Sequence, residues 1–300
     1  MYINQANQGK NNGWRVLITL LLAGGVFIAN AIMYFFMTKE QIVQMYDELK
    51  KLSKNEQIIS SLMPFVFLLG LLFFLVRFLH KRSVLSLTTS REKVDFRRIL
   101  FSFSLIIILT LVGFFVSYSL DHSTIIWNFN PLQFAILLLI SLVLFPFQIG
   151  FEEFLFRGYL MQQIAIIVRN KWFPLLFTSL LFGLLHGTNP EVAKMGMGVM
   201  FFYIGTGLLL GIMTLMDDGI ELALGFHLGN NLMSALLITS DFSAIQTNAV
   251  FKYSSEIDTV NILNEMIVSM LIVYPIILFI FVKKYRWSGW TEKLTGKIHT

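Results

Sequence analysis

The sequence has 300 residues, of which 56% are hydrophobic, 15% aromatic and only 14% charged, and its mean hydropathy is +0.70. A soluble domain has about 25% charged residues, so this composition excludes an ordinary soluble fold and indicates a chain that lies within a lipid bilayer. The absence of cysteine excludes disulfides, thiolate zinc sites and cysteine nucleophiles. The formal charge of +5 comes from short basic clusters beside apolar segments. That pattern sets membrane orientation and does not indicate nucleic-acid binding.

Apolar segments that reach or approach the ~20 residues of a membrane-spanning helix recur along the chain. No alternation of apolar and polar residues with a period of two persists, which excludes spanning strands. We therefore predict an all-α fold, a polytopic helical bundle of about eight transmembrane helices in the cell membrane. The predicted spans are residues 14–36, 58–79, 99–120, 132–149, 172–186, 197–216, 220–239 and 262–282.

Polar joints separate some of these spans: an amphipathic stretch over residues 38–57, a basic joint over 81–98 and a longer joint over 241–260. The sequence shows no internal repeat and no low-complexity tract. We therefore expect one membrane domain in three parts. These are residues 1–130 with the N-terminal helices and their joints, residues 131–240 with the polar motifs described below, and residues 241–300 with the last loop, the final helix and a basic tail.

The distribution of Lys and Arg predicts the orientation. If the N-terminus is cytoplasmic, fifteen of these residues lie on the inner side and six on the outer side, so both termini are expected in the cytoplasm. Residues 29–31 resemble a signal-peptidase site, but the apolar stretch continues through Phe36, so the first segment is expected to be retained. The inner residues are Lys10, Arg15, Lys81, Arg82, Arg91, Lys93, Arg97, Arg98, Arg169, Lys171, Lys283, Lys284, Arg286, Lys293 and Lys297, and the outer ones are Lys39, Lys50, Lys51, Lys54, Lys194 and Lys252.

The first polar group inside an apolar segment is Glu152, Glu153 and Arg157. Each ionisable side chain in a bilayer costs on the order of 2.5 to 3.5 kcal/mol on insertion scales, so each needs a reason. Residues four apart share a helix face, so Glu153 is predicted to pair with Arg157, and such a pair could serve packing alone. Glu152 points elsewhere without that partner. Gln148, one turn before Glu152, is either a supporting donor or a helix-packing residue.

Two further polar groups contain histidine. His186 closes the short fifth span, where a lone histidine is often only an interfacial or capping residue. His227 lies one helical turn before Asn231 and shares its face, with Asn230 nearly as well placed. Such side chains also form hydrogen bonds between helices, so neither group alone indicates a function.

Together these residues are sufficient for the hydrolysis of an acyl bond. Glu152 could take a proton from water, His186 could orient that water, and His227 with Asn231 could donate hydrogen bonds to the oxyanion. Glu152, His186 and His227 could instead be three ligands of a catalytic zinc ion. Both arrangements require Glu152 to reach the depth of the histidines. At 1.5 Å per residue, this happens only if the fourth helix runs unbroken from residue 132 to residue 168.

Two arguments favour the metal-free arrangement over zinc, although the cofactor stays open. Zinc would occupy both histidines and leave Asn231 as the sole oxyanion donor, whereas without metal His227 donates beside it. Zinc-bound histidines also usually have a carboxylate on the other ring nitrogen, and none lies within one turn of His186 or His227. A partner from another helix cannot be seen in the sequence.

The ordered motifs EExxxR, FxxxH and HxxxN, each in an apolar segment, resemble those of the CPBP family of intramembrane proteases, also called the CAAX-prenyl endopeptidase and Abi families. The resemblance covers residues 130–240, and no motif position departs from the pattern. The motif residues are Glu152, Glu153 and Arg157, then Phe182 and His186, then His227 and Asn231.

The resemblance implies peptide-bond hydrolysis, with Glu152 and His186 activating water and His227 and Asn231 stabilising the oxyanion. Family members are described both as metalloproteases and as glutamate-dependent proteases. Bacterial members are associated with bacteriocin processing or self-immunity, peptide signalling and surface-protein regulation, and eukaryotic members trim prenylated CAAX tails. The abundance of Lys, Asn, Ile and Phe indicates an AT-rich bacterial source. The expected partners are a membrane-associated peptide or protein substrate and the lipid bilayer.

Two other classes of protein remain as alternatives. A transporter also buries Glu, Arg and His, but it usually shows paired, repeat-related broken helices, and none is evident. A non-catalytic membrane scaffold or immunity protein would tolerate the loss of a motif residue, and none is lost.

Overall fold

The computed structural model describes residues 1–38, 40–41, 44–45, 48, 51–254 and 258–298, and over these residues the fold is a bundle of helices. The predicted all-α membrane fold is confirmed, because long apolar helices dominate the described chain. The longer elements are α2 (Gly25–Phe36), α4 (Lys54–Phe74), α6 (Phe96–Leu120), α7 (Pro131–Glu153), α9 (Trp172–Leu185), α11 (Val199–Asp217), α12 (Glu221–Leu236) and α13 (Thr259–Tyr285).

Shorter helical elements extend or connect these helices. The 3₁₀ helix η1 begins the chain, and three π-helical segments, η2, η3 and η4, continue α1, α4 and α7. Their bounds are η1 (Ile3–Gln8), α1 (Gly13–Thr19), η2 (Leu20–Gly24), η3 (Leu75–Leu79), α5 (Leu85–Thr88), η4 (Phe154–Leu160), α8 (Met161–Val168), α10 (Pro190–Met195) and α14 (Trp290–Thr295).

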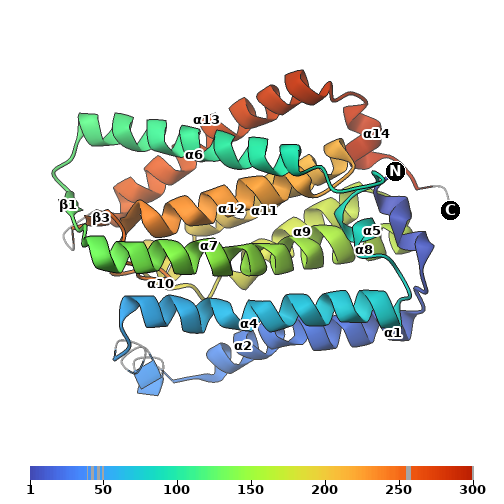
Figure 1. The fold of residues 1–300 in the computed structure, drawn as a ribbon, viewed down its shortest axis with the longest axis horizontal. Helices are drawn as coiled ribbons and strands as arrows, with labels where there is room; N and C mark the ends of the chain where they lie inside the picture. The colour runs from blue at the N-terminus through green and yellow to red at the C-terminus, as the bar shows by residue number, and fades with distance from the viewer. Residues whose placement is uncertain (39, 42–43, 46–47, 49–50, 255–257, 299–300) are drawn as a thin grey trace.

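The helices lie along the length of the molecule, with α4, α7, α12 and α6 following one another from the bottom to the top of Figure 1. Each helix of this row packs on the next, and α11 packs on both α9 and α12. Both termini lie at the same end of the bundle (Figure 1). Helices α7 and α12, which carry the two glutamates of the EExxxR motif and the HxxxN motif, are therefore inner members of the bundle.

Six helical segments of the described chain are long and apolar enough to cross a membrane. The predicted number of eight spans is not confirmed, because α9 has only 14 residues and α12 only 16. The fourth span does not end at residue 149 but continues to Val168 as one helical segment of 38 residues, as the depth of Glu152 requires. The six segments are Gly13–Phe36, Lys54–Leu79, Phe96–Leu120, Pro131–Val168, Val199–Asp217 and Thr259–Tyr285.

Polar residues next to the apolar runs explain where several helices begin. The Ser53 side chain accepts a hydrogen bond from the Glu56 amide while Glu56 accepts one from the Ser53 amide, a capping box that starts α4 inside the predicted 38–57 joint. Asn130 caps α7, with Pro131 in the first turn. Lys39 and Lys50, which the orientation argument counted, lie outside the described residues.

A small sheet, which the sequence did not predict, lies at the end of the bundle away from the termini (Figure 1). Its strand order is β1-β3-β2, with β1 (Ile125–Trp127) antiparallel and β2 (Ile238–Thr239) parallel to β3 (Phe251–Tyr253). Two or three residues are too few to show a period of two. The sheet ties the loop before α7 to the loops that follow α12.

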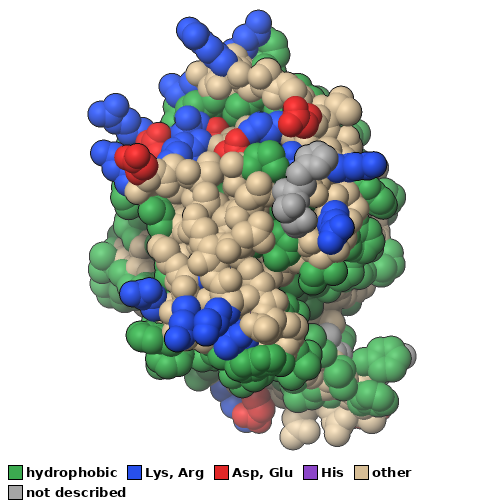
Figure 2. Space-filling view, turned by 90° about the vertical axis from the view of Figure 1, so that its right-hand side faces the viewer, with side chains coloured by type: hydrophobic (Ala, Val, Ile, Leu, Met, Phe, Trp, Pro, Cys, Tyr) green, Lys and Arg blue, Asp and Glu red, His purple; other side chains and the backbone are tan. Residues whose placement is uncertain are grey.

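The end that carries the termini is rich in Lys and Arg, as Figure 2 shows. Contacts between distant segments join it: the Lys10 amide donates to His80 O at 2.8 Å, and the Ile298 amide donates to Arg169 O at 3.0 Å. The predicted inner joints therefore meet at one end of the bundle. Which end faces the cytoplasm stays a prediction.

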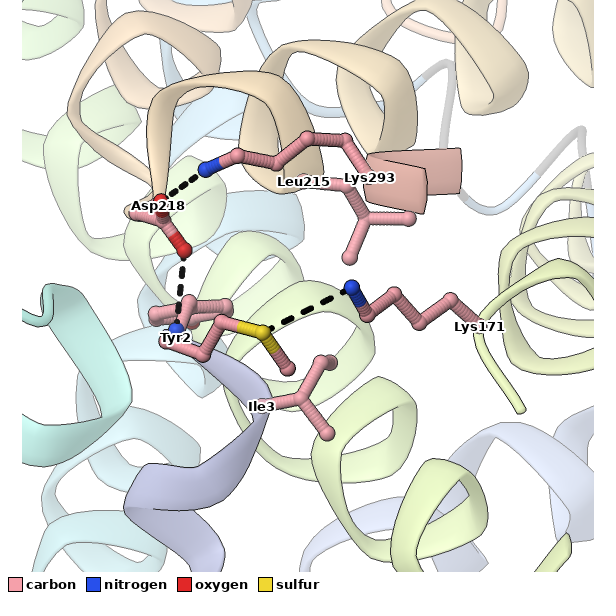
Figure 3. Close-up of a pocket in the computed structure, with 7 residues that line it drawn as sticks. Tyr2, Ile3, Lys171, Leu215, Asp218 and Lys293 are labelled. Carbon is pink, nitrogen blue, oxygen red and sulfur yellow. Dashed lines mark hydrogen bonds and ion pairs between the residues drawn. The ribbon is translucent and has the colours of Figure 1, made fainter. Parts of the chain in front are cut away.

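The same end contains a small open pocket, which is lined by Met1, Tyr2, Ile3, Lys171, Leu215, Asp218 and Lys293. Figure 3 shows Asp218 at its wall, accepting from the Tyr2 amide at 3.0 Å and from the Lys293 ammonium. Burial acts to raise the pKa of the Asp218 carboxyl, but the hydrogen bonds from Lys293 and from the Tyr2 amide outweigh it, so the pKa is lowered. None of the motif residues lines this pocket, so its polar groups serve to hold the N-terminal segment against α11 and α14.

Candidate functional site

The EExxxR motif lies where α7 changes into the π-helical η4. Glu152 and Glu153 are the last two residues of α7, and Arg157 lies within η4. The amide of Met161 bonds to Phe156 O, five residues back, as a π turn requires. Such turns are frequent at functional sites, and here the turn directly follows the two carboxylates.

Glu153 and Arg157 form the predicted pair. Arg157 Nη1 donates to Glu153 Oε1 at 3.0 Å, and both side chains are completely buried. Arg157 Nη2 also donates to Gly207 O on α11 at 3.1 Å. A Cβ on Gly207 would lie 2.8 Å from Ser179 O, so this glycine allows α11 to approach α9 closely enough for that contact.

Glu153 has a second partner that the sequence did not reveal. His227 Nδ1 lies 2.8 Å from Glu153 Oε1. Because a carboxylate only accepts, Nδ1 carries the proton of this hydrogen bond. Glu153 therefore holds the His227 ring as well as neutralising Arg157. The sequence has no carboxylate within one turn of His227, but Glu153 on α7 provides one that orients the ring. One of the two arguments against zinc, the missing carboxylate partner, therefore no longer holds for His227.

Glu152 faces the other nitrogen of the same ring. His227 Nε2 lies 3.6 Å from Glu152 Oε2, and Oε2 is buried without a hydrogen-bond partner among the described residues. Its other oxygen accepts from Gln148 Nε2 at 2.6 Å. Gln148 is therefore the supporting donor of Glu152, and the Oε2 atom keeps its capacity to accept a proton.

Asn231 is connected to Glu152 through the side-chain amide of Gln148. Its Nδ2 donates to Gln148 Oε1 at 3.2 Å, so Gln148 bridges Asn231 on α12 to Glu152 on α7. Asn230 contacts Asn231 with a longer bond of 3.4 Å. The choice of Asn231 over Asn230 as the partner of His227 stays a prediction.

His186 approaches the group from α9. It is the residue at which α9 ends, and its Nδ1 donates to Phe182 O at 2.8 Å, so Nε2 is the free nitrogen. The charges of Glu152 and His227 act on its imidazole, but no hydrogen bond or ion pair joins them in the described chain. Phe182 provides the contact, with its ring centroid 4.8 Å from that of His186 and 5.8 Å from that of His227.

A metal would have to be held by the three predicted ligands together. Over the described ranges, which include Glu152, His186 and His227, no group of three or more His, Cys, Asp or Glu side chains is arranged to hold a metal ion. The arrangement therefore does not fit a zinc ion with these three ligands, and we derive no step through a metal.

Comparisons with known proteins agree with the motifs. The family model described as type II CAAX prenyl endopeptidase Rce1-like matches residues 131–233, which span α7 to α12. A Bacillus subtilis (strain 168) protein described as uncharacterized protein YyaK is 29% identical over 245 residues, covering 77% of this chain and 80% of that protein. No solved structure matches significantly. The resemblance to the type II CAAX prenyl endopeptidase Rce1-like family is therefore borne out over residues 131–233, about a third of the chain.

Proposed function

We propose that this protein is an intramembrane endopeptidase that cleaves a peptide bond within or near the bilayer. The observation that carries the proposal is the buried Glu152 carboxylate, whose unpartnered Oε2 faces His227 Nε2 at 3.6 Å. A carboxylate and an imidazole nitrogen thus lie side by side, in a segment that matches a protease family.

Glu152 is the general base of this proposal. It takes a proton from water as the water oxygen attacks the carbonyl carbon, and it later passes that proton to the leaving nitrogen when the C–N bond breaks. The free Nε2 of His186 accepts from the same water and orients it. Peptide and water are thereby converted into a carboxylic acid and an amine, with no proton gained or lost by the protein.

His227 and Asn231 form the proposed oxyanion hole. Because His227 Nδ1 already donates to Glu153, a second donor at Nε2 requires the doubly protonated ring. In the proposed reactive state, Glu152 is a carboxylate and His227 carries a proton on both ring nitrogens.

The test uses purified protein in lipid vesicles with a set of membrane peptides, some ending in a prenylated CAAX tail and some not. Wild type is expected to cleave members of the set, Glu152→Gln is not, and chelator has no effect. Cleavage of prenylated peptides alone would assign a CAAX-type substrate. Equal product with wild type and Glu152→Gln would contradict the proposal and leave the transporter and scaffold alternatives.

The proposed location is the cell membrane, with both termini in the cytoplasm. Reporter fusions after Lys54 and after Lys252 are expected to read as external. An internal signal at either position would overturn the proposed orientation.

A further inference from the structure

The ring of Tyr203 on α11 lies against the imidazole of His186. The two ring centroids are 4.5 Å apart and the planes differ by 24°, which makes this a stacked contact. Tyr203 belongs to none of the motifs, and Phe182, the other ring on His186, is tilted by 48°. The aromatic group most nearly parallel to the His186 ring therefore comes from a residue without an assigned role.

Tyr203 is itself fixed by the segment that follows His186. Asn189 Nδ2 donates to the Tyr203 hydroxyl at 3.2 Å, and the Asn189 amide donates to His186 O at 3.0 Å. The contacts therefore form a closed circuit: from the His186 ring to Tyr203, from Tyr203 to the Asn189 side chain, and from the Asn189 backbone to His186. The circuit fixes both the ring and the backbone of the histidine.

The packing of α9 on α11 fixes the height of this contact. A Cβ on Gly183 would clash with the Ile204 side chain and lie 3.0 Å from the Ile204 amide. The backbones of α9 and α11 are therefore in close contact at Ile204, the residue next to Tyr203. Sliding either helix would break the stack. The Tyr203 ring is thus placed by backbone contact and not by side-chain flexibility.

We propose that Tyr203 is a positioning residue that holds the His186 imidazole in the orientation that activates water. The inference rests on the proposed function, in which His186 Nε2 accepts from the attacking water. The hydrogen bond from Nδ1 to Phe182 O, 2.8 Å long, fixes one edge of the His186 ring. The ring plane could still tilt about this hydrogen bond, and the stacked phenol of Tyr203 blocks that tilt.

The test compares Tyr203→Leu and Tyr203→Met, which fill space without a ring, with Tyr203→Phe, which keeps the ring. The control is Phe201→Leu, because Phe201 is 70% exposed on the same helix. The ringless variants are expected to lose roughly 2- to 10-fold in kcat with KM unchanged, since aromatic pairs contribute this much. Tyr203→Phe and Phe201→Leu should retain the wild-type kcat.

A second readout does not depend on proteolysis. Diethyl pyrocarbonate modifies unprotonated imidazole nitrogens, and mass spectrometry identifies the His186 adduct. Modification is expected to be roughly 2- to 10-fold faster in the ringless variants than in Tyr203→Phe. If neither of these variants folds, Tyr203→Ala replaces them, because it also removes the ring and cannot overpack the site, and it should accelerate modification in the same direction.

The two readouts separate failure of this inference from failure of the proposed function. If wild type cleaves peptides while the ringless variants match it in kcat and in the rate of modification, the role of Tyr203 is overturned and the protease stands. If wild type cleaves no peptide, the protease is overturned, and equal modification rates would also remove Tyr203 as the residue that holds His186.

Discussion

The two halves of the candidate site are held by different kinds of contact. On α7 and α12, hydrogen bonds connect Asn231 to Gln148 and Glu152, and connect His227 to Glu153. On α9, His186 is held by one backbone carbonyl and by aromatic rings. The comparison suggests that the first half controls charge and proton position, while the second half controls the direction of a single free nitrogen.

The largest effect is expected from removing the base in the hydrogen-bonded half. Glu152→Gln keeps an oxygen for Gln148 but cannot take a proton from water, so turnover should fall by about 10² to 10⁴-fold with an unchanged melting temperature. The assay is kcat on a cleaved peptide together with thermal unfolding in detergent. The exposed Glu292→Gln is the control, and an active Glu152→Gln would assign the base to another residue.

Removing the proposed oxyanion donor comes next. His227→Ala should lower kcat by about 10² to 10³-fold if His227 donates to the oxyanion, and chelator should not affect wild type. Loss of a bound zinc ion together with nearly all activity would instead support the three-ligand site. Metal content and turnover are measured on wild type, His227→Ala and the exposed control His122→Ala.

The buried ion pair tests how far the hydrogen-bonded half depends on charge. Glu153→Gln leaves Arg157 buried without a carboxylate, which should lower the free energy of unfolding by about 3 to 5 kcal/mol, and it weakens the support of His227. Glu221→Gln should cost less, because Arg91 is 27% exposed and keeps Asp217. Equal melting temperatures for the two variants would contradict the structural role of Glu153.

The smallest effect within the hydrogen-bonded half is expected at the bridge between α7 and α12. Gln148→Leu removes the donor to Glu152 and the acceptor of Asn231, and kcat should fall by about 10-fold, the equivalent of a ~1.5 kcal/mol hydrogen bond to a charged group. Gln163→Leu is the control, because that glutamine bonds to Asn11 away from the site. A loss as large as that of Glu152→Gln would give Gln148 a direct part in the chemistry.

The parts of this site that could be predicted from the sequence are those fixed within one helix. The spacing of Glu153 and Arg157, and of His227 and Asn231, follows from the helical repeat, and the depth of Glu152 required the long fourth helix that the structure has. The contact between Glu153 and His227 depends on how α7 and α12 turn toward each other. The relative rotation of two helices cannot be read from the spacing of residues along the chain. The stacking of Tyr203 on His186 could not be predicted for the same reason.

The number of spans was harder to predict than their positions. Apolar residues continue through 186 and 239, but α9 ends at Leu185 and α12 ends at Leu236, where the chain turns toward β2. Hydropathy measures composition, while helix ends depend on backbone hydrogen bonds such as that from the His186 amide to Gly183 O. The shortness of α9 could be predicted from the sequence, whereas the early end of α12 is visible only in the structure.

The π turn in η4 has a consequence for comparing this chain with its relatives. A π turn contains one residue more than the α-helix around it, so deleting one residue from 154–160 would leave Glu152 in place but rotate everything after it by about 100°. Tyr159, whose hydroxyl lies 3.0 Å from His80 Nε2, would then face another direction. In an alignment, a relative with a single-residue gap directly after the two glutamates would thus keep both carboxylates. The helix that follows them would be rotated and would lack the contact between Tyr159 and His80.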